Sequence, residues 1–144
     1  MARIYTVDAS VFLNAFNPYE VGHAESHRLL AQMQDEGVPI VVPTLLLPEV
    51  AAAVYRGRGD ADLARRFAAA LHRLPHLVLV SVDEVLAEQA ADVAAQHGLR
   101  GSDAVYAAVA LRFGSTLVSL DREQRERVAA VLPTCLPAEV LAGF

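Results

Sequence analysis

The sequence predicts an α/β domain: a three-layer α/β/α sandwich whose sheet of four to five strands is mainly parallel. Short runs of strand-forming residues alternate with longer helical segments along the whole chain, and this alternation is typical of a parallel sheet covered by helices. The length of 144 residues is that of one domain. No linker, repeat or low-complexity segment interrupts it, so we expect residues 1–144 to form a single domain.

Strand-forming runs predict the strands, while capping and terminating residues set the predicted helix boundaries. Asp60, Asp83 and Ser102 precede helical segments as N-caps, and Gly37 and Gly98 follow others as stops. In chain order we expect a strand over 4–7, helices over 11–16 and 19–35, a strand over 38–42, helices over 44–56 and 61–71, a strand over 77–80, helices over 84–96 and 103–113, a strand over 116–120, a long final helix over 122–131 and a candidate fifth strand over 134–136.

Composition and charge exclude several classes of protein. A formal net charge of -5 argues against a protein that coats nucleic acid non-specifically. All twelve basic residues are arginines, so the chain cannot supply the lysine of a P-loop or of a Schiff base. No apolar run is long enough for a transmembrane span, and no signal-like segment precedes the first strand. With Cys135 as the only cysteine, no internal disulfide can form, and we expect a cytoplasmic protein.

Four of the seventeen acidic residues stand out because their neighbours are apolar. Two of them follow predicted strands, and two lie in the first turns of predicted helices. The carboxyl ends of parallel strands share one edge of a sheet, where ligands bind in open α/β folds. If the first and fourth strands are neighbours, all four acids converge at that edge. They are Asp8, Glu49, Asp103 and Asp121.

Each of these acids has an ordinary role when taken alone, as a helix cap or as a partner of a helix dipole. Asp121 with Gln124, for example, has the spacing of a capping box. As a set they are harder to explain, because carboxylates gathered in an apolar cleft repel one another and lose hydration unless they are protonated, paired with cations or bound to a metal. Oxygen ligands alone favour a hard ion, Mg²⁺ or Mn²⁺. We therefore expect a divalent metal site.

The segments around the four acids resemble the motifs of the PIN-domain ribonucleases. The likeness is greatest to the toxins of VapBC-type toxin–antitoxin pairs, which are single PIN domains of about this length. It covers nearly the whole chain, and the four motifs occur in the family's order, the third being the most specific. The segments are Asp8-Ala9-Ser10, Leu47-Pro48-Glu49-Val50, residues 101–110 and Leu117-Val118-Ser119-Leu120-Asp121.

The resemblance implies a metal-dependent endoribonuclease, with Mg²⁺ as cofactor and Mn²⁺ as an alternative. The implied reaction is hydrolysis of an RNA phosphodiester by in-line attack of an activated water at phosphorus. The implied partners are an RNA substrate, a cognate antitoxin and a second copy of the chain in a homodimer, with no membrane. In the family's pattern the catalytic metal ligands correspond to Asp8, Glu49, Asp103 and Asp121, and supporting polar positions to Ser10 and Ser119.

Other features leave alternatives open. Residues 45–53 and 61–71 carry more apolar surface than one helix face needs, which suits a dimer interface, a groove for an antitoxin helix, or a deep core. His23 and His27 have ligand spacing, but no third ligand for zinc is apparent. Glu123, near an occasional fifth acidic position of the family, is expected on the solvent face of the last helix. The arginines suited to RNA phosphates, or equally to a solvated surface, are Arg65, Arg66, Arg73 and Arg100.

Two rival functions remain at this stage. An aspartate-nucleophile phosphatase of doubly wound fold would need a second acid two residues after Asp8, and that position is Ser10. A non-catalytic PIN-like module that binds protein or RNA would not need all four acids. The sequence leaves open which RNA would be cut and whether one or two metal ions act.

Overall fold

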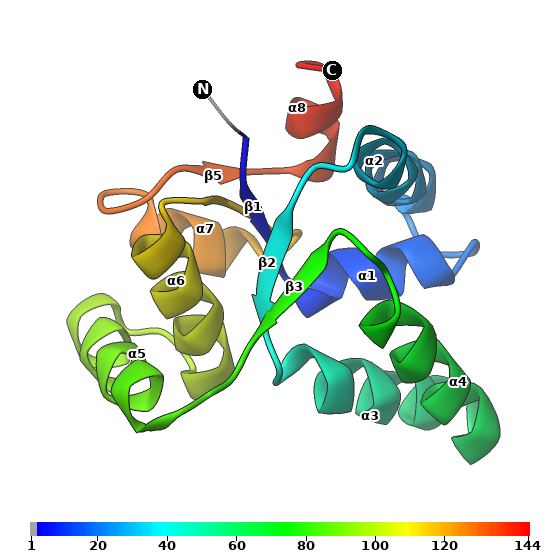
Figure 1. The fold of residues 1–144 in the computed structure, drawn as a ribbon, viewed down its shortest axis with the longest axis horizontal. Coiled ribbons are helices and arrows are strands. Elements are labelled where there is room, and N and C mark those ends of the chain that lie inside the picture. The colour runs from blue at the N-terminus through cyan, green and yellow to red at the C-terminus, as the bar shows by residue number, and fades with distance from the viewer. Residues whose placement is uncertain (1–2) are drawn as a thin grey trace.

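A five-stranded sheet, parallel throughout, forms the centre of the computed structural model, which describes residues 3–144. Its strand order is β3-β2-β1-β4-β5, so the first strand lies between the second and the fourth (Figure 1). The predicted parallel sheet, its candidate fifth strand and the pairing of the first and fourth strands are confirmed. The strands are β1 (Tyr5–Val7), β2 (Ile40–Pro43), β3 (Leu77–Val80), β4 (Thr116–Val118) and β5 (Thr134–Cys135).

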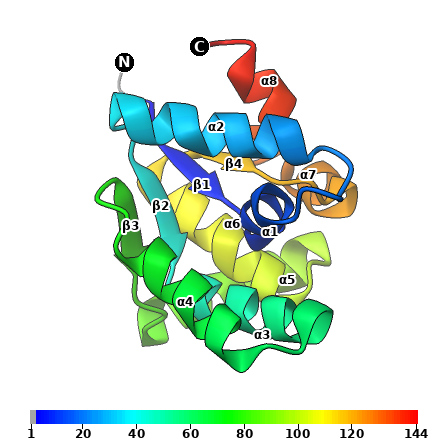
Figure 2. The same cartoon turned by 90° about the vertical axis from the view of Figure 1, so that its right-hand side faces the viewer.

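Helices cover both faces of the sheet and complete the predicted three-layer sandwich. In Figure 1, α1 to α4 lie on one side of the strands and α5 to α7 on the other, and Figure 2 looks onto the first of these faces. The arrangement follows from right-handed crossovers, because the chain moves outward from β1 in opposite directions in its two halves. The helices are α1 (Ala9–Phe16), α2 (His23–Glu36), α3 (Leu46–Arg58), α4 (Ala61–His72), α5 (Glu84–His97), α6 (Gly101–Phe113), α7 (Arg122–Val128) and α8 (Pro137–Leu141).

The strand order creates a topological switch point between β1 and β4. From β1 the chain proceeds to β2 and β3 on one side, and from β3 it returns to β4 and β5 on the other. The pairing places Val7 opposite Val118, and the Asp8 N–H donates to the Val118 carbonyl at 3.0 Å. Helices that leave neighbouring strands toward opposite faces open a crevice at the carboxyl ends of those strands. The expected edge for a ligand therefore lies beside Asp8.

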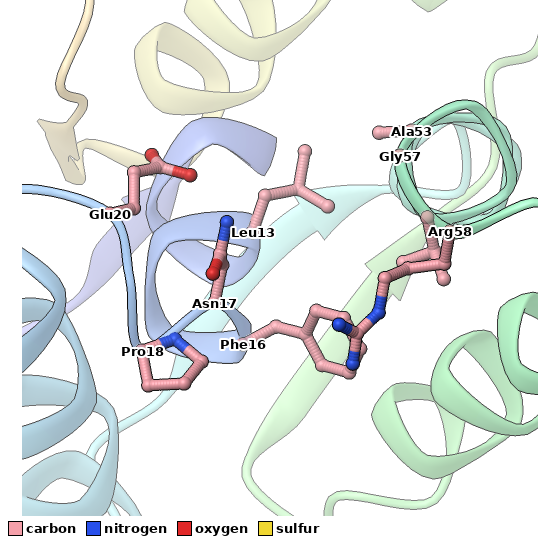
Figure 3. Close-up of a pocket in the computed structure, with 9 residues that line it drawn as sticks. Leu13, Phe16, Asn17, Pro18, Glu20, Ala53, Gly57 and Arg58 are labelled. Carbon is pink, nitrogen blue, oxygen red and sulfur yellow. The ribbon is translucent and has the colours of Figure 1, made fainter.

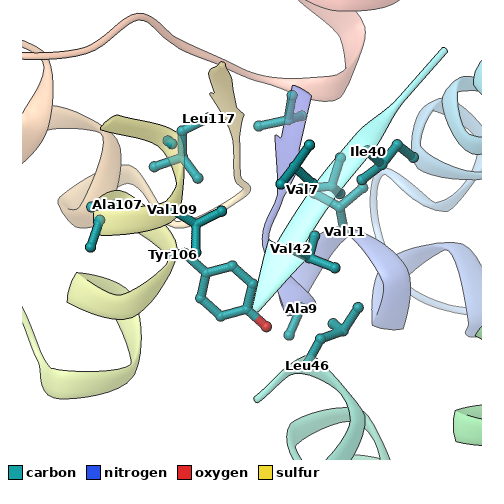
Figure 4. Close-up of a cluster of buried hydrophobic side chains, with 14 of the residues drawn as sticks. Val7, Ala9, Val11, Ile40, Val42, Leu46, Tyr106, Ala107, Val109 and Leu117 are labelled. Atoms are coloured by element: carbon teal, nitrogen blue, oxygen red, sulfur yellow. The ribbon is translucent and has the colours of Figure 1, made fainter. Parts of the chain in front are cut away.

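The hydrophobic core lies between the sheet and its covering helices, with α6 as the most buried helix (Figure 4). Tyr106 is fully buried on α6, and Val7 and Val42 are buried on adjacent strands. Small residues such as Ala107 allow α6 to pack closely against the strands. Consecutive residues of β2 are all buried, as expected for a strand covered on both faces. The first turn of α6, with Asp103 and Ala104 buried, is thereby held in the core.

Several predicted boundaries were wrong. Helix α2 begins at His23 instead of residue 19, because Gly22 takes the left-handed conformation (φ 87°) immediately before it. The predicted long helix over 122–131 ends at Val128. The sequence reading missed α8, which begins with Pro137 in its first turn and is capped when the Glu139 carboxylate accepts the Leu136 N–H at 2.8 Å.

The start of α6 also differs from the prediction. Ser102 is not the N-cap, since the helix already includes Gly101 and its N-cap is Arg100. No side-chain hydrogen bond caps this end. Arg100 is thus three residues before Asp103, one helical turn away, which brings its side chain over the first turn. Within residues 3–144, no helix has the length and apolarity needed to cross a membrane.

Candidate metal centre

Asp8 lies at the carboxyl end of β1 and is 7 % exposed. Its carboxylate accepts the Ser10 N–H at 3.3 Å, which makes it the N-cap of α1. The same Oδ2 atom lies 3.2 Å from the Ser119 hydroxyl, on the segment that follows β4. Asp8 therefore caps a helix and also faces the switch point, and the capping role does not exclude a second role at that edge.

The electrostatic environment of Asp8 opposes its ionisation. Burial raises the pKa of the Asp8 carboxyl, hydrogen bonds from Ser10 and Ser119 act in the opposite direction, and the charge of Asp103 raises it further. Within residues 3–144, no arginine or histidine forms an ion pair with Asp8. A buried carboxylate without a cationic partner is a group that a bound cation would stabilise.

Glu49 enters the site from the first turn of α3, where its pairing with Tyr106 of α6 fixes its position. The Tyr106 hydroxyl donates to Glu49 Oε1 at 2.7 Å. Burial raises the pKa of Glu49, the Tyr106 hydrogen bond lowers it, and the charges of Asp8 and Asp103 raise it. Burial and the neighbouring Glu49 charge also raise the pKa of Tyr106 well above its ordinary value, so Tyr106 is a hydrogen-bond donor.

Arg100 lies between the other two acids. Its Nε donates to Asp103 Oδ2 at 3.1 Å, and its Nη2 donates to Asp121 Oδ2 at 3.4 Å. One guanidinium thus bridges a carboxylate from the first turn of α6 and a carboxylate that follows β4. The hydrogen bond to Asp103 and the charges of Asp103, Asp121 and Asp8 raise the pKa of Arg100. Arg100 is the cation that partly neutralises this edge.

A buried network supports the carboxylates from below. The Ser119 hydroxyl accepts the Asp121 N–H at 3.0 Å and lies 2.7 Å from Gln124 Oε1. Since Ser119 has one hydroxyl hydrogen, Gln124 and Asp8 compete for it, and the Gln124 contact is the shorter. The Gln124 amide also reaches toward the Asp103 carbonyl at 3.5 Å. Gln124 therefore ties together the segments that carry Asp103 and Asp121.

This network corrects one sequence prediction. Asp121 caps α7, because its Oδ1 accepts the Gln124 N–H at 3.2 Å. The Gln124 side chain, however, does not return to the Asp121 N–H, so the expected capping box is incomplete. Instead Gln124 turns inward to Ser119, and it is almost fully buried. Ser10 has a supporting contact of its own, since its Oγ accepts the Leu120 N–H at 3.2 Å and ties α1 to the segment after β4.

Asp8, Glu49 and Asp103 interact electrostatically with one another, and Arg100 links Asp121 to Asp103, but the four side chains do not form a ready-made coordination shell. Among residues 3–144, no three acidic, imidazole or thiol groups are close enough to hold one ion. Tyr106 holds Glu49, and Arg100 stands between Asp103 and Asp121. The donors nevertheless fit a hard divalent cation in kind, since they are carboxylates with only one guanidinium among them. Coordination requires these side chains to reorient.

Other candidate residues lie outside this cluster. His23 Nδ1 is 2.9 Å from the Asn14 carbonyl, and its ring centroid lies 5.6 Å from that of His27. No third ligand joins the two histidines within the described residues. Glu123 is exposed and forms an ion pair with Arg127 one turn along α7, in accord with the expected solvent face.

Sequence reasoning assigned no role to Tyr106, gave Gln124 only a capping role and gave Arg100 only a general one. Tyr106 and Arg100 are each three residues from Asp103, so helical spacing around that acid was the signal that could have found them. Gln124 had the spacing of a cap, and its inward orientation depends on the buried Ser119 beside it. That contact could not be read from spacing.

A parallel α/β sandwich with acidic residues gathered at its switch point defines the class of this protein. The chain belongs to the PIN-domain family, whose sequence profile matches residues 5–130. No curated protein sequence matches the chain closely enough to count as a relative.

Solved structures of similar fold include toxins and toxin–antitoxin complexes. The Mycobacterium tuberculosis toxin VapC20, described as cleaving the sarcin–ricin loop, is 23 % identical with a TM-score of 0.73, and the match covers 90 % of this chain and 95 % of that one. PAE2754 from Pyrobaculum aerophilum is 24 % identical with a TM-score of 0.70, covering 99 % and 97 %. A chain of VapBC2 from Rickettsia felis, in a complex bound to promoter DNA, is 16 % identical with a TM-score of 0.68, covering 92 % and 98 %. At these identities the likeness establishes a shared fold.

Proposed function

We propose that this chain is a metal-dependent endoribonuclease and the toxin of a type II toxin–antitoxin pair. The observation that carries the proposal is the clustering of Asp8, Glu49, Asp103 and Asp121 at the switch point of a PIN domain, with Arg100 as their only ion-pair partner among the described residues. A binding module would gain nothing from an excess of partly buried negative charge, which costs stability.

In this proposal the four carboxylates hold Mg²⁺ or Mn²⁺, while Ser10 and Ser119 hold the segments that carry Asp8 and Asp121. The metal would supply positive charge that polarises the scissile phosphate and stabilises the leaving oxygen. Tyr106 keeps Glu49 oriented and, by donating a hydrogen bond, favours its ionised form.

Substrate access is expected on the side of Glu49. A hollow of about 400 Å³ lies beside it, and its lining includes Pro48, Leu13 and Arg56. The apolar walls suit a ribose or base edge, and the Arg56 guanidinium suits a phosphate next to the cleaved one. On this proposal the RNA strand lies across the start of α3.

Cleavage of RNA by the purified chain tests the nuclease proposal. We expect endonucleolytic cutting with Mg²⁺ or Mn²⁺, none in EDTA, and a loss of at least about a hundredfold in Asp8→Asn, because the variant removes a charged ligand. Asp35→Asn, which changes an exposed acid on α2, is the matched control and should cleave like the wild type. Equal cleavage by the wild type and Asp8→Asn would reject the site. Hydrolysis of a phosphomonoester alone would favour the phosphatase alternative, and binding of RNA without cleavage would favour the non-catalytic module.

The antitoxin proposal is supported by a second hollow, between α1 and α3 (Figure 3). It measures about 300 Å³ and is lined mainly by apolar side chains, among them Leu13, Phe16 and Ala53, with Arg58 at its edge. Such a groove suits an apolar segment of a partner that also carries an acidic residue to pair with Arg58. The apolar residues of α3 and α4 that we considered for an interface are partly used in packing these helices together, and of them only Ala53 also lines this groove.

Expression in a bacterial host tests the toxin proposal. We expect growth arrest that Asp8→Asn abolishes and that co-expression of the protein encoded alongside relieves. Gly57→Glu, which places a charge on a part of the groove lining that the hollow beside Glu49 does not share, should remain toxic but resist relief. Ala70→Glu, on the exposed face of α4, is the matched control and should still be relieved. Cleavage in vitro without growth arrest would remove the toxin claim and keep the nuclease claim.

We also propose a homodimer, as the family resemblance implies. A mass twice that of one chain in sedimentation at micromolar concentration is the expected result, and a monomer across that range would reject it.

A further inference from the structure

Arg100 has an unusual position for a residue next to a candidate metal site. Within residues 3–144 it is the only cation that forms ion pairs with the four acids of the site. It contacts one oxygen of each of two carboxylates through two different nitrogens, so its guanidinium lies between Asp103 and Asp121. A metal ion bound by both carboxylates would have to occupy the position that the Arg100 guanidinium takes.

The anchoring of Arg100 makes it easy to displace. Its side chain is 76 % exposed, and the backbone at this position is the extended N-cap of α6, which no side-chain hydrogen bond closes. Exposed ion pairs contribute little to stability, because water solvates both partners and a long side chain must be held in one conformation. Asp103, by contrast, is buried and held on α6. The arginine can therefore move away while the carboxylates remain.

We propose that Arg100 is a tethered counter-cation: it bridges Asp103 and Asp121 in the metal-free protein, competes with the divalent ion for their oxygens, and is released by the metal to bind a phosphate of the RNA. The inference rests on the proposed function, since it concerns the same metal site and substrate. Because Arg100 is attached at the N-terminus of α6, the released guanidinium stays next to the carboxylates, where a bidentate contact to a phosphate is available to it.

The exchange limits the cost of gathering acids in the absence of metal. Carboxylates left unpaired would repel one another and destabilise the fold. With Arg100 in place, Asp103 and Asp121 are partly neutralised, and hydrogen bonds to Asp8 and Glu49 partly offset the cost of burying those two carboxylates. The free energy of metal binding is then less favourable than at a site without an internal cation, so the apparent metal affinity is lower than at such a site.

Mn²⁺ binding by calorimetry tests the competition, with Arg100→Gln compared to Arg122→Gln. Both variants remove one positive charge close to Asp121, but Arg122 pairs with Glu126 and contacts none of the four acids. We expect Arg100→Gln to bind Mn²⁺ roughly three- to tenfold more tightly than the wild type, and Arg122→Gln to stay within about twofold, because only the first removes a competitor. Arg100→Gln should also cleave RNA more slowly at saturating Mn²⁺, since it lacks the phosphate contact.

Mn²⁺ binding by Arg100→Gln that is weaker than in the wild type, or tighter by less than about threefold, would overturn the proposal, and so would an equal gain in Arg122→Gln. Arg100→Lys provides a second variant that keeps the charge but lacks the separate Nε and Nη2 donors through which Arg100 contacts the two carboxylates, and it too should bind Mn²⁺ more tightly than the wild type. If wild type and variants all bind no Mn²⁺, the metal-dependent function itself fails. If all bind Mn²⁺ equally and cleave RNA, only the exchange fails.

The displacement can also be followed directly in the wild type. The Arg100 Nε–H resonance, assigned by its loss in Arg100→Gln, should shift when diamagnetic Mg²⁺ is titrated in, at the same concentrations that saturate the site in calorimetry. A resonance that stays in place while Mg²⁺ binds would overturn the proposal.

Discussion

Replacing Tyr106 with phenylalanine removes a single oxygen atom from the interior, where the hydroxyl donates to Glu49 Oε1 at 2.7 Å. Hydrogen bonds to charged groups contribute about 1.5–3 kcal/mol. We expect a value near the lower end, because Glu49 is only half-buried and water can partly replace the lost donor. The phenylalanine leaves no unpaired donor of its own and fits the same space. The expected cost is about 1.5 kcal/mol, which corresponds to a fall in Tm of roughly 3–6 °C.

The assay is urea unfolding of metal-free protein near neutral pH, in a double-mutant cycle with Glu49→Ala. Because the Tyr106 hydrogen bond stabilises the ionised form of Glu49, the cost of Tyr106→Phe should shrink as the pH falls through the folded-state pKa of Glu49, which burial raises above the ordinary value of 4.5. Tyr55→Phe is the control, since this tyrosine on α3 is 54 % exposed and should change stability by less than about 0.3 kcal/mol. The reasoning is refuted if Tyr106→Phe costs as much in the Glu49→Ala background as in the wild type.

Three further predictions concern the supports of the site and a cap far from it. Burial raises the folded-state pKa of Asp8, so the contribution of Asp8 to stability is complete below the unfolded-state pKa near 3.8 and is lost as the pH rises through the folded-state pKa. In EDTA, the Tm of Asp8→Asn should therefore exceed that of the wild type by a margin that grows from acidic to neutral pH. A margin that stays constant with pH would contradict this. Ser119→Ala leaves the Asp121 N–H and Gln124 Oε1 without their buried partner. This variant should lower the free energy of unfolding in urea by about 1–3 kcal/mol and also weaken Mn²⁺ binding. An unchanged Tm would mean that water replaces the hydroxyl. Asp83→Ala removes the acceptor of the α5 cap at 2.8 Å and should cost about 1 kcal/mol without altering Mn²⁺ affinity; a change in affinity would show that the site depends on distant parts of the fold.

Local signals predicted much of this fold. Asp60 and Asp83 cap their helices through the expected backbone N–H groups, and β3 has the predicted boundaries of residues 77–80. Such features depend on contacts within three or four residues, which a sequence displays directly. Predicted helix boundaries were wrong where a short polar segment offered more than one residue that could serve as the cap. The Ser102 cap was wrong for this reason, since the chain turns one residue earlier, at Arg100.

The sequence by itself determined the parallel α/β class, the identity of the four acids and their order along the chain. Only the tertiary structure decided how those acids are held. Tyr106 meets Glu49 from a helix 57 residues further along, and Ser119 lies beside Asp8 across 111 residues. These contacts arise because β1 and β4 pair at the centre of the sheet, and no local propensity encodes that pairing. The place of Arg100 between two carboxylates was decided in the same way, by the packing of α6 beside the end of β4.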